Sequence, residues 1–84
     1  MKTIVDPAAE FVLAVERVFG VRPRVLDGSR AVLIGDVKLS LEDGEKELWL
    51  VRMLPPALED WIAGIEVGGD IEGALRRAKA VLDG

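Results

Sequence analysis

Residues 31–56 read AVLIGDVKLSLEDGEKELWLVRMLPP, and this stretch decides the fold. Between positions 30 and 42 every odd position is apolar or glycine, which is the two-residue period of a β-strand. The pattern predicts one long strand over residues 30–41 with a bend at Gly35. The Asp43-Gly44 pair is a hairpin signal, so a second strand is expected over residues 46–53. Pro55 and Pro56 then end the ladder, because proline cannot donate to it.

A two-residue turn at Asp43-Gly44 would set Glu42 opposite Glu45 and Leu39 opposite Leu48. We call the side that carries Leu39 and Leu48 the inner face, since it holds the apolar odd positions. A third strand is expected over residues 21–26, joined to residue 30 by a three-residue loop around Asp27-Gly28. That loop length keeps Arg22 and Arg24 off the inner face, where burying their charge would be costly.

Helical signals flank these strands. Asp6 suits the N-cap and Pro7 the first position of a helix, apolar residues follow at helical spacing, and Gly20 suits the end of that helix. A second helix is expected over residues 57–65, where Leu58, Trp61 and Ile62 would form an apolar stripe. Asp70 predicts the N-cap of a third helix that continues to the C-terminus. The chain is therefore expected to be a single α+β domain over residues 1–84, ordered helix, three-stranded antiparallel meander, helix, helix, in a two-layer sandwich.

The strand at 46–53 is apolar on both faces, so the outer face of the sheet also needs a cover. This register places Lys38 across from Trp49, which permits a cation–π contact, and Ile34 across from Met53. Three covers are open at this point: the helix at 57–65, a second copy of the chain, or a different protein. The candidate interface residues are Trp49, Val51, Met53, Trp61 and Ile34.

Composition limits the chemistry that the chain can perform. The 84 residues contain no His and no Cys, so the usual base and thiol nucleophile are missing. The acidic turn at Glu42, Asp43, Glu45 and Glu47 reads as a solvated hairpin tip rather than a metal site. We expect no enzyme activity, no cofactor and no metal. No apolar run approaches the length of a membrane span, so a cytoplasmic protein without membrane contact is expected. The high charged fraction of 31% together with absent Asn, Gln and Cys is thermophile-like.

These observations favour a small protein-interaction module of the adaptor or chaperone-like kind, acting as a homodimer through the outer face and the helix at 57–65. Another protein is a second possible partner. The alternative is a nucleic-acid-binding protein that uses Arg22, Arg24, Arg30 and Lys38 beside Trp49. The net charge of −4 disfavours nucleic acid as a partner.

The order helix, three antiparallel strands, helix resembles the double-stranded-RNA-binding domain. In that resemblance GGDIEGALRRAKAVL would be the final helix, with Arg76, Arg77 and Lys79 as phosphate contacts. Asp70 and Glu72 stand where that family has basic residues. Residues 11–56 are similar in rhythm to small acidic chaperones of type III secretion, which dimerise and hold an extended segment. Neither resemblance rests on a residue-specific motif, so no family is assigned from the sequence.

Overall fold

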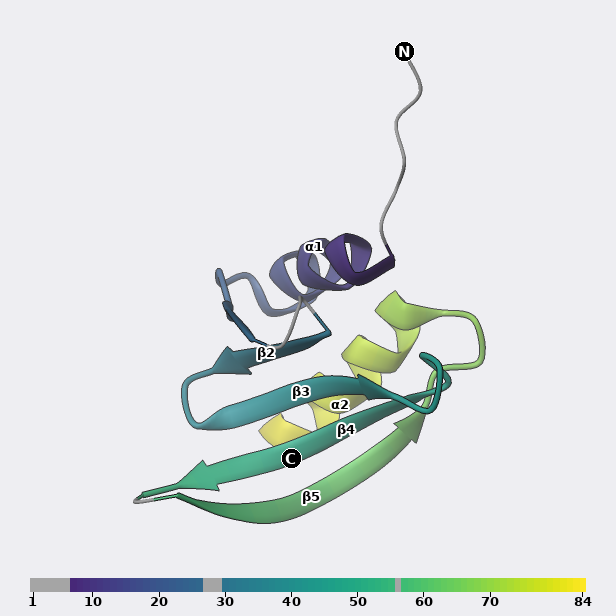
Figure 1. The fold of residues 1–84 in the computed structure, drawn as a ribbon. Coiled ribbons are helices and arrows are strands. Elements are labelled where there is room, and N and C mark those ends of the chain that lie inside the picture. Colours follow the sequence, from purple (N-terminus) through teal and green to yellow (C-terminus); the bar gives the residue numbers. More distant parts are fainter. Residues whose placement is uncertain (1–6, 27–29, 56) are drawn as a thin grey trace.

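The structure, a computed structural model, describes residues 7–26, 30–55 and 57–84. Its elements follow the order α1 (Pro7–Phe19), β1 (Arg24–Leu26), β2 (Ala31–Ile34), β3 (Val37–Glu42), β4 (Glu47–Leu54), β5 (Leu58–Glu66) and α2 (Ile71–Asp83). The strands form one five-stranded antiparallel meander in chain order, and both helices lie on the same side of it (Figure 1). The α+β class is confirmed, but the sheet has five strands rather than three, and the described chain has two helices rather than three.

Both helices lie where their sequence signals place them. The Gly20 N–H donates to the carbonyl of Glu16 at the end of α1, and Gly20 adopts a positive φ of 70°. The Asp70 side chain accepts from the Gly73 N–H at 2.9 Å and caps α2 as expected. The predicted Asp6 cap and the loop at 27–29 lie outside the described residues. The first strand is shorter than predicted, since β1 begins at Arg24 rather than at residue 21.

The long strand predicted over residues 30–41 is two strands joined by a tight turn. Ile34 pairs with Val37, so Gly35 and Asp36 form a two-residue hairpin turn. Gly35 has φ 61°, and glycine at the first of two turn positions is typical of a type II′ turn. The turn changes which positions face inward. Val32 pairs with Leu39 and is completely buried in the core, although the sequence placed it on the outer face.

The turn between β3 and β4 is longer than the predicted two residues. Residues 43–46 make the connection, and Glu42 pairs with Glu47 instead of Glu45. The Lys46 N–H donates to the carbonyl of Glu42, which closes this wider turn. Leu39 consequently pairs with Leu50 rather than Leu48. Two extra loop residues leave the alternation unchanged, so Leu39 and Leu48 still share the inner face.

The helix predicted over residues 57–65 is a strand. β5 turns back immediately after the prolines and pairs with β4 along its whole length, from Leu54 opposite Leu58 to Glu47 opposite Glu66. Its register changes between Leu50 and Val51: Leu50 pairs with Ala63 and Val51 pairs with Trp61. Ile62 is therefore the extra residue of a β-bulge.

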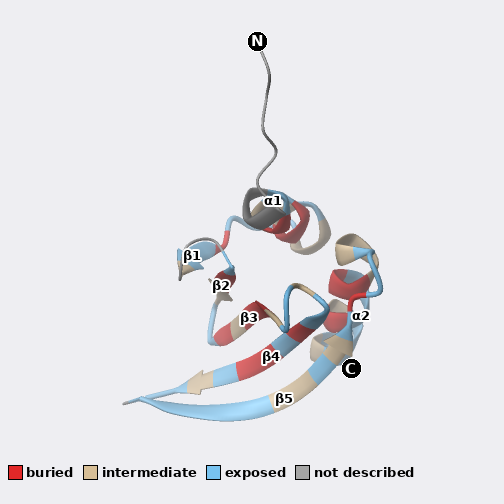
Figure 2. Cartoon of the chain, turned by 45° about the vertical axis from the view of Figure 1, so that its right-hand side comes forward, coloured by how far each residue is buried: buried red, intermediate tan, exposed pale blue. Residues whose placement is uncertain are grey.

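The core fills the space between the inner face and the two helices. Phe11 and Val15 of α1 and Leu75 of α2 are fully buried against Leu39 and Leu50 of the central strands. Figure 2 shows buried residues on the helix sides that face the sheet and on β2, β3 and β4, while β5 is exposed over most of its length. Burial of these side chains at about 25 cal/mol per Å² is the main force that holds the layers together.

Candidate outer-face interface

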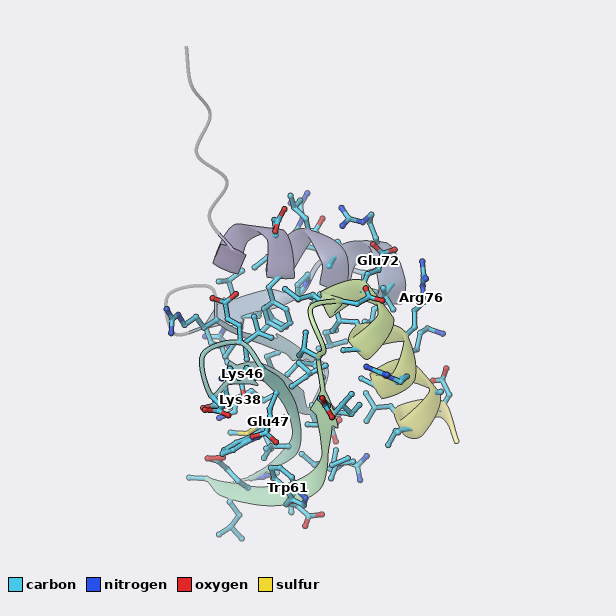
Figure 3. The ribbon with its side chains drawn as sticks, turned by 90° about the vertical axis from the view of Figure 1, so that its right-hand side faces the viewer. Lys38, Lys46, Glu47, Trp61, Glu72 and Arg76 are labelled. Carbon is cyan, nitrogen blue, oxygen red and sulfur yellow. The ribbon has the colours of Figure 1, made fainter. Side chains whose placement is uncertain are left out.

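The sheet has a second face that neither helix covers. Paired residues of an antiparallel ladder point to the same side, so the register assigns this face strand by strand. Figure 3 shows Lys38, Glu47 and Trp61 on the side of the sheet away from α2. We call this surface the outer face; it consists of Arg24, Leu26, Ala31, Leu33, Lys38, Ser40, Glu42, Glu47, Trp49, Val51, Met53, Glu59, Trp61, Gly64 and Glu66.

Two tryptophans dominate the outer face. The ring centroids of Trp49 and Trp61 lie 5.4 Å apart with the ring planes at 77°, an edge-to-face arrangement that aromatic pairs prefer. Trp49 is 37% exposed and Trp61 is 56% exposed, so both rings meet solvent. They are the two tryptophans of the chain. Side chains of this kind contribute most of the binding energy in many protein interfaces.

Gly64 makes the aromatic pair possible. It is the partner of Trp49, and a Cβ added to it would lie 3.2 Å from Cζ2 and 3.3 Å from Cη2 of Trp61. The missing side chain leaves the space that the Trp61 indole occupies. Sequence reasoning placed Gly64 inside a helix and missed this role. An isolated glycine in a strand often marks the close approach of another group, and that signal was present in the sequence.

Small residues beneath the rings are already shielded from water. Val51 is the partner of Trp61, Ser40 is the partner of Trp49, and both are buried although no helix lies above them. Met53 follows on the same side of β4 and is partly buried. The centre of the outer face is thus an apolar, partly dry patch formed by Trp49, Val51, Met53 and Trp61. We call these four residues the tryptophan patch.

The charges around the tryptophan patch are mostly negative. Lys38 pairs with Val51 rather than with Trp49, so the predicted Lys38–Trp49 opposition is wrong. Its Nζ lies 3.6 Å from Oε1 of Glu59, in an ion pair that reaches from β3 to β5 across β4. The outer face carries two basic residues, Arg24 and Lys38, against the four glutamates at 42, 47, 59 and 66. This balance is opposite to what a phosphate backbone attracts.

The remaining predicted site residues are dispersed. Ile34 pairs with Val37 and packs at the margin of the core, so its placement on the outer face opposite Met53 is wrong. The physical reason is the turn at Gly35, which reverses the faces of β2. Arg24 lies on the outer face of β1, while Arg22 precedes that strand and Arg30 lies in the turn before β2; all three are exposed. The four basic candidates therefore do not form one cluster around Trp49.

Of two shallow hollows, one borders the tryptophan patch at Met53 and the other lies away from it. One of about 400 Å³ opens between β1, β2 and β3 and is lined by Leu26, Arg30, Lys38, Ser40 and Met53 among others. A second, of about 370 Å³, lies between the helices. There the Glu72 carboxylate accepts from Arg76 at 2.8 Å and lies 3.5 Å from the Arg17 guanidinium (Figure 3). Exposed ion pairs of this kind add at most about 1 kcal/mol each to stability.

Within residues 7–26, 30–55 and 57–84, no group of three acidic side chains is arranged to hold a metal ion. This includes the acidic turn between β3 and β4. In the same ranges no helix has both the length and the apolar character needed to cross a bilayer. Comparison of the chain with protein-family models, with curated proteins and with solved structures finds no match in any of the three.

Proposed function

We propose that the protein is a non-enzymatic interaction module that forms a homodimer through its outer face. The observation that carries the proposal is the exposed Trp49–Trp61 pair on a sheet face that α1 and α2 leave open. Aromatic residues and Met are enriched at interface centres, and the surrounding rim is polar. The tryptophan patch and its acidic surroundings have this composition.

The outer face is suited to pair with itself. On the outer face, Glu47 and Glu66 lie at one end of β4 and β5, and Met53 and Glu59 lie toward the other end, where Glu59 is ion-paired with Lys38. In such a dimer the two sheets would pack face to face, with the twofold axis between them and perpendicular to the strands. This axis reverses the strand direction in the second copy. The end with Glu47 and Glu66 in each copy then lies over the partner's end with Met53 and the Lys38–Glu59 ion pair, and the tryptophan patches meet near the axis. Such an arrangement keeps Glu47 and Glu66 of one copy away from Glu47 and Glu66 of the other.

Molar mass tests the proposal. Light scattering after size exclusion should give twice the 9.1 kDa chain mass at tens of micromolar. Trp61→Ser should raise the dimer dissociation constant about 30-fold, which corresponds to about 2 kcal/mol for an interface anchor. Leu13→Ser is the matched control, because Leu13 is 53% exposed on α1, away from the outer face. A monomer at every concentration, or equal weakening by Leu13→Ser, contradicts the proposal.

A further inference from the structure

β5 is the last strand of the sheet, and its second edge has no strand partner among residues 7–26, 30–55 and 57–84. It is nine residues long, whereas β1 at the opposite edge has three. Figure 2 shows β5 along the border of the sheet with most of its length exposed. A long open edge presents unpaired backbone donors and acceptors, to which another strand can add.

The ladder with β4 shows which backbone groups point outward. The Val67 N–H donates to the carbonyl of Lys46 at 2.9 Å, so Val67 faces β4, and by alternation Ile65 and Ala63 do the same. Gly64 and Glu66 therefore direct their N–H and carbonyl groups to the open edge. Arg77 of α2 already donates to the Glu66 carbonyl at 2.6 Å. The available edge consequently runs from Gly64 back toward Leu58.

The charge of β5 selects between possible strands. Its sequence LEDWIAGIE contains three acidic residues and no basic one. Pairing two copies of β5 would bring six carboxylates into one ribbon, and like charges in neighbouring strands are destabilising. Among the described residues, Lys38 lies within ion-pair distance of Glu59, while the carboxylates of Asp60 and Glu66 have no cationic group within 4 Å. A strand with basic side chains would supply the missing countercharge.

We propose that the open edge of β5 binds an extended basic peptide as a sixth, antiparallel or parallel strand. Backbone hydrogen bonds to the segment from Leu58 to Gly64 would hold it, and its cationic side chains would approach Asp60 on one face and Glu66 on the other. Because Gly64 has no side chain, an aliphatic residue of the peptide can lie beside the exposed Trp61 indole. The backbone edge of β5 lies outside the tryptophan patch, and Trp61 is the one residue that both sites would use, so the test below includes a variant that disrupts the proposed dimer interface without changing β5.

The probe is a capped nine-residue peptide that repeats Lys-Lys-Val-Val, which puts both residue types on each face of an extended strand. It is titrated into the full chain by calorimetry, and amide shifts are followed by NMR. Saturable binding is expected, with the largest shifts on β5. D60N/E66Q should weaken binding at least threefold, and the matched pair E10Q/E16Q on α1 should leave it unchanged. E66Q keeps the backbone carbonyl that Arg77 contacts.

Two N-methylated versions of the probe, one for each peptide edge, separate strand addition from simple charge attraction. N-methylation of alternate residues removes the N–H donors along one peptide edge and keeps every charge. The form methylated on the edge that faces β5 should bind at least tenfold more weakly than the form methylated on the other edge. Equal binding of both methylated forms overturns the inference, as does an absence of binding at millimolar peptide. The Trp49→Ser variant disrupts the proposed dimer interface. If the peptide binds this variant and the unaltered chain with equal affinity, the edge site stands independently of the homodimer.

Discussion

The contact between Trp49 and Trp61 can be measured by a double-mutant cycle. The perturbation is Trp49→Ala, Trp61→Ala and the pair together. With exposures of 37% and 56%, the two side chains bury about 160 and about 110 Å² if a tryptophan offers about 250 Å². At about 25 cal/mol per Å² these areas correspond to about 4 and about 2.7 kcal/mol. Compactness of the unfolded chain lowers both figures, to about 3 and about 2 kcal/mol.

The cycle should show coupling. An edge-to-face aromatic pair contributes about 1 kcal/mol, and this contribution is lost only once when both rings are removed. The double variant should therefore lose about 4 kcal/mol rather than the 5 kcal/mol expected from additivity. A chain of this length has a free energy of unfolding of about 4–13 kcal/mol, so a loss of about 4 kcal/mol can unfold the double variant. A stabilising osmolyte at the same concentration in all four samples keeps the proteins folded.

Urea denaturation followed by far-UV circular dichroism provides the assay, at a protein concentration low enough to keep the chain monomeric. The four free energies of unfolding give the coupling energy directly. Additivity within about 0.3 kcal/mol would refute the pair, because residues in contact depart from additivity by more than this. A coupling of the expected size would show that β5 holds Trp61 against Trp49 in the isolated chain.

Two further predictions concern the turns and caps that set up the fold. Gly35→Ala should cost about 1–2 kcal/mol because φ at this position is 61°, and Gly35→Asn should cost less because Asn tolerates positive φ; equal unfolding midpoints would argue against the hairpin at Gly35. Gly73→Ala should have little effect in the unaltered chain, because the gain in helix propensity of about 1 kcal/mol is offset by collision of the new Cβ with the Asp70 carboxylate. Asp70→Ala alone should cost about 1 kcal/mol, and in that background Gly73→Ala should raise the free energy of unfolding by about 1 kcal/mol. An equal effect of Gly73→Ala with and without the Asp70 carboxylate would contradict the N-cap at Asp70.

The helices could be predicted because their signals are local. Pro7, Gly20 and Asp70 mark helix ends through their own backbone and side-chain chemistry, which needs no knowledge of distant residues. The strand β4 was also predictable. Apolar residues on both of its sides indicate a buried strand, and the prolines after it mark where the strand ends. Trp49, Val51 and Met53 consequently lie on the expected face of the sheet.

The errors arise where two patterns are equally consistent with the sequence. AVLI is apolar at every position, so both parities of β2 suit the core, and the Gly35-Asp36 turn can reverse the faces without exposing an apolar stripe. Leu58, Trp61, Ile62 and Ile65 fit helical spacing, but the same residues also pair well with β4. Tertiary pairing decides between these patterns, because β4 would otherwise leave its backbone groups unpaired at an edge.

The bulge at Ile62 links the misassigned segment to the candidate site. An unbroken register from Glu47–Glu66 would place Ile62 opposite Val51 and turn Trp61 toward the helix side. With the bulge, Ile62 packs at the margin of the core, and Trp61 lies opposite Val51 on the outer face beside Trp49. As a helix, this segment could have covered the outer face; as a bulged strand it widens that face and adds an aromatic ring to it. The extra residue therefore brings Trp61 into the tryptophan patch, while the second edge of β5 stays unpaired within the described residues.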